Sequence, residues 1–337
     1  MRIVVTGATG NVGTALLRRL QQEDVDVVGV VRRPPEPVGP YAGVEWHAAD
    51  VANGPAALAE AFLGADAVVH LAWLLQPNHR ERVLAATNIG GTRHVLEAAA
   101  AADVRQVVVA SSVGAYSPGP KNRRVDESWP TGGLATSHYA RHKAVVERML
   151  DAFEARRPEV RVVRMRPGLV MQAAAGEELR VLFGGRALPT GWLGRIPVPL
   201  VPLPPRMRSQ VVHADDLADA FARAVLQHAS GAFNVAAEPV VGPPDVAALL
   251  RGRWVPVRIA PLRGLVWLAW QLHLVASDPG WIDIATSVPL MSTERARDEL
   301  GWTPRRGAQE SLAEAVRGVA DRKTEEGSPH LRSARNS

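Results

Sequence analysis

Short apolar runs alternate with longer segments of helical periodicity in the first half of the chain. The runs are rich in Val and Ile, which is typical of buried strands. Strands are predicted at residues 2–6, 25–31, 44–47, 67–71, 106–110 and 160–166, and helices at 11–22, 55–63, 79–101 and 137–156. Strands joined in this way form an α/β fold with a doubly wound parallel sheet, which binds ligands beyond the carboxyl ends of its strands.

The regular alternation of predicted strands and helices ends at about residue 172. Six prolines between residues 188 and 205 prevent a regular helix there. Helices are predicted at 215–227, 244–250, 262–276, 293–300 and 309–323, without equally regular strands. We therefore predict a sheet domain over 1–171, to which 211–235 returns, a smaller and mostly helical substrate lobe over 172–323, and a disordered tail over 324–337.

The amino-acid composition excludes some kinds of catalytic and binding site. The 337 residues include no Cys, which excludes thiolate nucleophiles and cysteine-ligated zinc. Of the 39 basic residues 36 are Arg, which indicates codon bias more than function. A net charge of +5, with acidic residues interspersed, does not predict nucleic-acid binding.

No targeting or membrane-spanning segment is predicted. Met1 and Arg2 lead directly into the first strand, so a cytoplasmic location is expected. The longest uncharged apolar stretch, 264–277, is too short to cross a bilayer and contains Gln271 and His273. We interpret it as a buried or interfacial helix and expect no stable membrane insertion.

A glycine-rich loop, TGATGNVG, occupies residues 6–13 between the first predicted strand and helix. Gly7 permits a tight turn, Gly10 lets the backbone approach a pyrophosphate, and Gly13 lets helix and strand pack closely. A turn without a ligand is the alternative, but the flanking strand and helix favour nucleotide binding. The candidate cofactor contacts here are Gly7, Thr9, Gly10, Asn11, Val12 and Gly13.

The residues after the second strand bear on the choice of cofactor. An acidic residue there favours NAD, whereas Arg accommodates the 2′-phosphate of NADP. This chain has Arg32 and Arg33, which favours NADP. An accidental arginine pair, with Glu36 nearby, leaves NAD as the alternative.

A serine, a tyrosine and a lysine form the candidate catalytic group. Ser112 follows the fifth strand, and Tyr139 and Lys143 share one face of a later helix. A lysine ammonium beside a phenol lowers the phenol pKa toward the working pH. The alternative is a helix-surface pair, which is a poor explanation because the chain contains only three Tyr and three Lys.

An ordered series of motifs runs through most of the chain. They are TGATGNVG, Asp50-Val51, His70-Leu71-Ala72, Asn88-Ile89-Gly90-Gly91-Thr92, SSVGAY (111–116), YARHK (139–143), Arg166-Pro167-Gly168, VHADDLADA (212–220), Phe233-Asn234-Val235 and LGWTP (300–304). With these motifs, residues 2–320 resemble the extended short-chain dehydrogenase/reductase family, also called the NAD-dependent epimerase/dehydratase family. The resemblance implies a Rossmann domain, an NAD(P)-dependent oxidoreductase with a small-molecule substrate, and a homodimer formed through two helices.

The resemblance also implies roles for individual residues. Ser112 would hold the substrate oxygen, Tyr139 would be the general acid/base, and Lys143 would bind the ribose and tune Tyr139. Asn88 would support this catalytic group. Further cofactor contacts would be Asp50 and Val51 at the adenine, Leu71 and Ala72 at the nicotinamide ribose, and Trp73 and Pro167 at the nicotinamide.

Neither histidines nor paired aspartates predict a metal site. His70, His138, His142 and His213 belong to separate motifs. Asp215 and Asp216 open a predicted helix, where carboxylates cap exposed N–H groups. The chemistry expected of Ser112, Tyr139 and Lys143 requires no metal.

The substrate is the open question. Relatives that act on nucleotide sugars typically carry Arg-Asp-Phe before the valine-histidine strand, whereas this chain has Arg208-Ser209-Gln210. Trp73 stands where many relatives have alanine. With Trp192, Trp267 and Trp270 it favours an apolar substrate, although a Trp/Leu stripe is more often core, or serves a dimer or membrane contact.

Three functions follow from this reasoning. The leading hypothesis is an NADP-dependent reductase or dehydrogenase acting on a small, rather apolar carbonyl or alcohol. The second is a nucleotide-sugar epimerase or dehydratase with tightly bound NAD. The third is a non-catalytic NADP-binding sensor, which the intact Ser112, Tyr139 and Lys143 disfavour.

Overall fold

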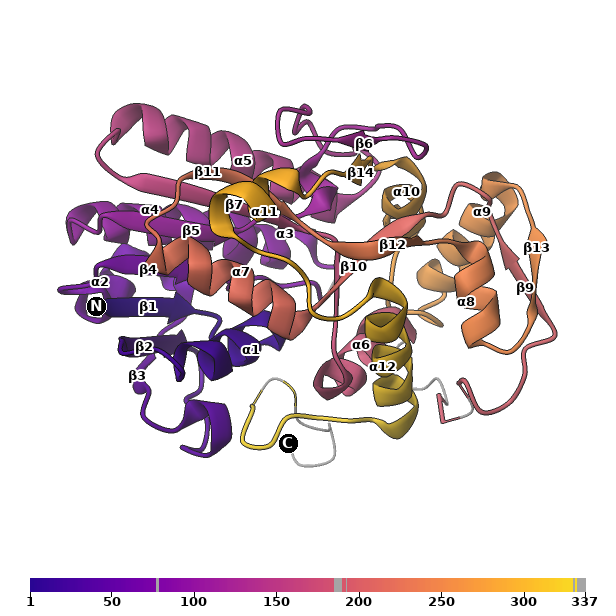
Figure 1. The fold of residues 1–337 in the computed structure, drawn as a ribbon, viewed down its shortest axis with the longest axis horizontal. Coiled ribbons are helices and arrows are strands. Elements are labelled where there is room, and N and C mark those ends of the chain that lie inside the picture. Colours follow the sequence, from indigo (N-terminus) through magenta and orange to yellow (C-terminus); the bar gives the residue numbers. More distant parts are fainter. Residues whose placement is uncertain (77–78, 185–189, 192, 330, 332–337) are drawn as a thin grey trace.

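A seven-stranded, all-parallel sheet forms the centre of the protein (Figure 1). The computed structural model describes residues 1–76, 79–184, 190–191, 193–329 and 331. The strand order is β3-β2-β1-β4-β5-β7-β11. The strands are β1 Arg2–Thr6, β2 Asp26–Val31, β3 Glu45–Ala48, β4 Ala67–His70, β5 Gln106–Ala110, β7 Arg161–Pro167 and β11 Gly231–Val235. This order reverses beside β1, and it confirms the predicted doubly wound Rossmann fold.

Helices cover both faces of the sheet. In chain order the described α-helices are α1 Asn11–Leu20, α2 Ala59–Phe62, α3 Glu81–Ala85, α4 Thr92–Ala101, α5 His138–Arg156, α6 Gly176–Gly184, α7 Ala214–Leu226, α8 Pro243–Leu249, α9 Ile259–Gln271, α10 Gly280–Ser287, α11 Glu294–Leu300 and α12 Ala308–Asp321, and only some of them lie on the sheet. One core lies between the sheet and α1 and α7, and a second core lies between the sheet and α2, α4 and α5. The helix predicted at 79–101 is interrupted by a π-helical segment, Ala86–Gly91.

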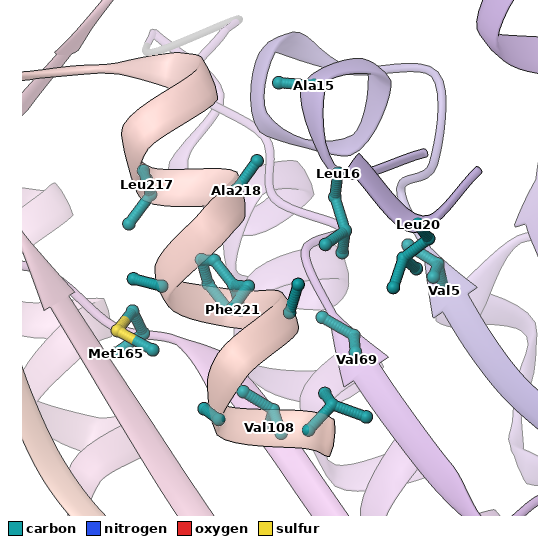
Figure 2. Close-up of a cluster of buried hydrophobic side chains, with 14 of the residues drawn as sticks. Val5, Ala15, Leu16, Leu20, Val69, Val108, Met165, Leu217, Ala218 and Phe221 are labelled. Carbon is teal, nitrogen blue, oxygen red and sulfur yellow. The ribbon is translucent and has the colours of Figure 1, made fainter. Parts of the chain in front are cut away.

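The first core is closely interleaved (Figure 2). Ala218 and Phe221 of α7 lie toward Leu16 and Leu20 of α1, whereas Leu217 lies on the other side of α7. Val69, Val108 and Met165 of the sheet complete this cluster. Leu16 and Phe221 are fully buried. Residues 211–235, which were predicted to return to the first domain, supply both α7 and the edge strand β11. The domain boundaries themselves stay a prediction.

The second half contains more strand than its sequence pattern indicates. A mixed three-stranded sheet has the order β12-β10-β8, from Ala237–Val241, Ser209–His213 and Leu169–Met171. Two parallel pairs join β9 Leu200–Leu203 to β13 Arg253–Pro256, and β6 Arg124–Val125 to β14 Leu290–Met291. Strands of two to five residues, several containing proline, leave too little periodicity to be detected.

Part of the predicted disordered tail packs against the sheet domain. Ser328 is fully buried, and its hydroxyl donates to the Thr9 carbonyl at 3.0 Å. Leu331 is 1% exposed, and its N–H donates to the Ser328 hydroxyl. Ser328 and Leu331 therefore pack on the protein within a segment for which disorder stays a prediction, while 330 and 332–337 lie outside the described residues.

The first core supplies a stability prediction. Leu16→Ala removes a fully buried side chain between α1 and α7 and should lower the free energy of unfolding by about 2–5 kcal/mol. Leu63→Ala removes the same atoms from a side chain that is 66% exposed and should change it by less than about 0.5 kcal/mol. Urea unfolding measures both. Equal effects of the two substitutions would contradict the assigned core.

Candidate active site

A cavity of about 300 Å³ lies beyond the carboxyl ends of the sheet strands. Its lining comes from the loops after β1, β2, β4 and β5, from α5, and from α6 and α10. Parallel strands bring all these loops to the same edge, which explains how residues far apart in sequence meet here.

The glycine loop has the geometry of a phosphate cradle. Gly7 has φ +71°, and a Cβ there would lie 2.7 Å from the Ala72 nitrogen. A Cβ on Gly13 would overlap the Gly7 carbonyl. Gly10 begins α1 with no side-chain cap, and the first turn of α1 contains no acidic residue. The N–H groups and dipole of this helix end therefore fit an anionic pyrophosphate.

All but one of the predicted cofactor-binding residues line the cavity. Those lining it are Gly7, Thr9, Gly10, Asn11, Val12, Gly13, Arg32, Asp50, Val51, Leu71, Ala72, Trp73, Tyr139, Lys143 and Pro167. Arg33 is not among the described lining residues. The residues present therefore fit a dinucleotide, and Arg32 is the arginine among the described lining residues.

Ser112 and Tyr139 are brought together by two local caps. The Ser112 hydroxyl accepts from the Gly114 N–H at 3.0 Å, which starts a short turn after β5. Ser137 caps α5 by accepting from the Ala140 N–H at 3.3 Å, so Tyr139 lies in the first turn. Burial raises the pKa of Tyr139 to about 12, although its hydrogen bond with Ser112 acts in the opposite direction.

Lys143 reaches the cavity and is held there by a backbone carbonyl and an aromatic ring. Its Nζ donates to the Ala110 carbonyl at 2.6 Å and lies 3.4 Å from the ring centroid of Trp73. The corresponding distance to the Tyr139 ring is 5.8 Å. Burial lowers the pKa of Lys143 to about 7, against the charge of Glu147. Burial dominates the pKa of the Tyr139 phenol in this geometry, and the effect of Lys143 on that pKa stays a prediction.

Aromatic and aliphatic side chains form the end of the cavity beside Tyr139. Trp73 and Trp281 lie against the Tyr139 ring, with centroids 5.9 and 5.1 Å away. The aliphatic lining here is Leu74, Leu75, Leu182 and Ile284. The predicted contribution of Trp73 agrees with this placement.

For two other tryptophans the sequence left pocket, core and a surface contact open. Trp267 and Trp270 lie on α9, outside the cavity lining, and Trp267 is 48% exposed. Trp192 lies outside the described residues. Trp281 of α10 lines the cavity instead, a placement that only the packing of α10 on α5 reveals.

Asn88 supports the cavity from behind. Its carbonyl oxygen accepts from the Leu74 N–H at 2.8 Å, and its amide donates to the Leu74 carbonyl at 2.9 Å. This pair of bonds fixes the loop that carries Trp73. Asn88 does not line the cavity, so its expected supporting role becomes that of a positioning residue.

Glu178 is a cavity residue that sequence reasoning missed. It lies on α6, and its Oε2 is buried without a hydrogen-bond partner among the described residues. Burial raises its pKa to about 7. The segment GEELR resembles any exposed helix start, so the sequence offered no signal for a buried carboxyl.

The aspartates and histidine after β10 have structural contacts. Asp216 accepts from the N–H groups of Arg305 and Arg306, at 3.1 and 3.0 Å. Asp215 pairs with Arg18 at 2.6 Å, and the His213 ring accepts from the Asp215 N–H. These contacts are consistent with the predicted structural role.

The sequence pattern of the NAD dependent epimerase/dehydratase family matches residues 3–236. The chain therefore belongs to this family, the extended short-chain dehydrogenase/reductases. The fold agrees. A UDP-glucose 4-epimerase from Thermus thermophilus, solved with NAD, superposes with a TM-score of 0.68 at 22% identity, over 95% of this chain and 99% of that one.

Two relatives match most of the chain. An uncharacterized protein of Mycobacterium tuberculosis is 29% identical over 94% of this chain, which spans 30% of that protein's length. A 3-diazoavenalumate denitrifying reductase from Streptomyces is 29% identical over 90% of this chain and 96% of its own length.

The raised pKa of Glu178 predicts a stability that depends on pH. In the unfolded chain this carboxyl ionises near pH 4.5, whereas in the folded protein it stays protonated up to about pH 7. The folded state therefore loses stability as pH rises through this window. Glu178→Gln should abolish the loss and exceed the wild type in free energy of unfolding at pH 8 by at most about 3 kcal/mol, because one pKa unit corresponds to about 1.4 kcal/mol.

Urea unfolding at pH 5 and pH 8 measures this difference. Glu60→Gln, on an exposed side chain of α2, is the control and should change little at either pH. A Glu178→Gln advantage that is the same at both pH values would contradict a buried, protonated carboxyl.

Proposed function

We propose that this protein is an NADP-dependent reductase or dehydrogenase that transfers hydride to or from a small, rather apolar carbonyl or alcohol. The convergence of Ser112, Tyr139 and the glycine loop on one cavity carries the proposal. The apolar wall of Trp73 and Trp281 beside Tyr139 supports the substrate class.

The proposed roles follow from position. NADPH, when bound, supplies the hydride for the carbonyl carbon. Tyr139 gives its phenolic proton to the carbonyl oxygen, and the Ser112 hydroxyl donates a hydrogen bond to that oxygen, so negative charge never develops there alone. Lys143 binds the ribose hydroxyls, and its ammonium at the same cavity stabilises the phenolate that remains. In the oxidative direction each transfer is reversed.

Two observations support an uncharged substrate end. The Glu178 carboxyl would oppose a diphosphate once it ionises, since like charges repel. Arg32 is the one arginine among the described lining residues, and we assign it to the cofactor.

The type of reaction is supported by a relative. The Streptomyces relative, which matches over nearly its full length, is named a reductase.

A second candidate, a nucleotide-sugar epimerase or dehydratase using NAD, is favoured by a neighbouring cavity. This cavity, of about 140 Å³, shares Trp281 and Ile284 with the first and is lined by Lys121 and Arg208. Burial, together with the charges of Arg206 and Arg208, lowers the pKa of Lys121 to about 7. Such a cation cluster suits an anionic group. Thermal-shift measurements with sugar nucleotides and with simple ketones separate the two candidates, because a ligand of the folded state raises the midpoint.

The proton-transfer role predicts a large and specific loss of activity. Tyr139→Phe should lower kcat for NADPH-dependent carbonyl reduction roughly 100- to 10,000-fold. Tyr41→Phe is the matched control: it removes another buried phenol hydroxyl, bonded to Thr14 outside the cavity lining, and should leave kcat within about threefold. NADPH oxidation followed by absorbance measures both. Full turnover by Tyr139→Phe would overturn the proposed chemistry.

The cofactor assignment predicts a selective loss of NADP affinity. Arg32→Ala should raise Kd for NADP roughly 10- to 100-fold, as expected for losing a charged hydrogen bond, and change Kd for NAD little. Arg33→Ala, outside the cavity lining, is the matched control. Fluorescence titration of the wild type and the two variants with NADP and with NAD gives the six dissociation constants. Tighter binding of NAD than NADP by the wild type would favour the second candidate.

A further inference from the structure

Helix α9 presents an apolar face to solvent. None of its residues, Ile259–Gln271, is buried. Leu265, Leu268 and Leu272 follow a single stripe along the helix and are 65%, 49% and 60% exposed. Trp267 on another side of α9 and Leu274 beyond its end are also exposed, by 48% and 67%. A surface helix ordinarily turns its apolar face to the core, so this arrangement needs an explanation.

The opposite side of α9 attaches the helix to the protein. Arg263 pairs with Asp283 of α10 at 3.0 Å, and the Trp270 ring stacks on His79 with centroids 4.2 Å apart. These contacts hold the leucine stripe outward. The exposure is thus a property of the folded lobe.

The surroundings of the stripe are cationic. Residues 246–277 contain four Arg and no Asp or Glu. Arg251, Arg253 and Arg258 are exposed, the last at the N-terminus of α9. Strand β13, which carries Arg253, ends three residues before α9 begins, and Figure 1 draws α9, β13 and β9 at the same end of the molecule. The exposed Leu200 of β9 pairs in register with Arg253.

Apolar and cationic groups together fit an anionic lipid surface. The leucines would enter the boundary between headgroups and acyl chains, while the arginines meet lipid phosphates. A second copy of this chain is a poorer occupant, because a two-fold interface would set the arginine-rich patch against itself. Among the described residues no helix is long and apolar enough to cross a membrane.

The stripe is also connected to the rim of the main cavity. The Ser277 hydroxyl, six residues after α9 ends, donates to the carbonyl of Leu182, which lines the cavity. Gln76, in the loop after Trp73, donates to the Ala276 carbonyl at 3.0 Å. A surface bound through α9 would therefore lie beside the apolar end of the cavity.

We propose that α9, with the exposed arginines before it, docks the protein peripherally on an anionic phospholipid bilayer. The docking does not depend on which reaction the cavity supports. The apolar and the electrostatic contributions to membrane binding can be measured separately. The leucines contribute by burial in the bilayer, and the arginines contribute an electrostatic attraction that salt weakens.

Sedimentation with vesicles tests the docking. The full chain should bind vesicles of phosphatidylcholine with roughly 30% phosphatidylserine, and bind pure phosphatidylcholine at least about tenfold more weakly. The double variant Leu268→Ser, Leu272→Ser should weaken binding at least about tenfold. Each of Arg253→Gln and Arg258→Gln should weaken it about fivefold and reduce the salt dependence. Leu63→Ser and Arg93→Gln, exposed elsewhere, are the matched controls.

Two results would overturn the proposal. One is vesicle binding that is absent, or that the leucine and arginine variants leave unchanged. The other is a dimer, detected by sedimentation equilibrium without lipid, that the leucine variants dissociate. Unchanged thermal midpoints and NADP affinity would show that the variants fold, so a loss of vesicle binding can be assigned to the surface itself.

Discussion

The buried carboxylate of Glu147 joins α5 and the loop after β5, which carry the proposed catalytic residues, to strand β7. It accepts from the Ser111 hydroxyl of the loop after β5 at 2.5 Å and forms a two-point pair with Arg166 of β7, at 2.9 and 2.8 Å. Burial would raise the pKa of Glu147, but Arg166 and Ser111 hold it below its usual value. Removing one partner of such a pair leaves an uncompensated buried charge, which costs several kcal/mol.

Glu147 also orients α5. Tyr139, Lys143 and Glu147 follow one another at intervals of four residues and therefore share one helix face. Because Glu147 is held by Ser111 and Arg166, the same helix face directs Tyr139 and Lys143 into the cavity. Ser112, directly after the anchored Ser111, then meets Tyr139. A structural ion pair thus sets the geometry of the proposed proton transfer.

The cavity combines two environments. Its cofactor end is backbone-rich and polar, built on the glycine loop, whereas its substrate end is formed by Trp73, Trp281 and leucines. Lys143 lies at the junction, between the Ala110 carbonyl and the Trp73 ring. Desolvation there shifts the pKa values of Tyr139 and Lys143 in opposite directions, since burial disfavours phenolate and ammonium alike.

The sheet, the glycine loop and the residues Ser112, Tyr139 and Lys143 could be predicted from the chain alone. Strand periodicity, glycine spacing and an i, i+4 pair are local signals, and local signals survive in the sequence. Features that depend on contacts between distant segments could not be predicted in this way. Folding placed Trp281 in the cavity and left Trp267 on the surface. It buried the Oε2 atom of Glu178 without a partner among the described residues and packed Ser328 on the glycine loop. It also left the leucines of α9 exposed. A hydrophobic pattern marks which side chains are apolar, but whether a lobe buries or exposes them is fixed only when that lobe is assembled.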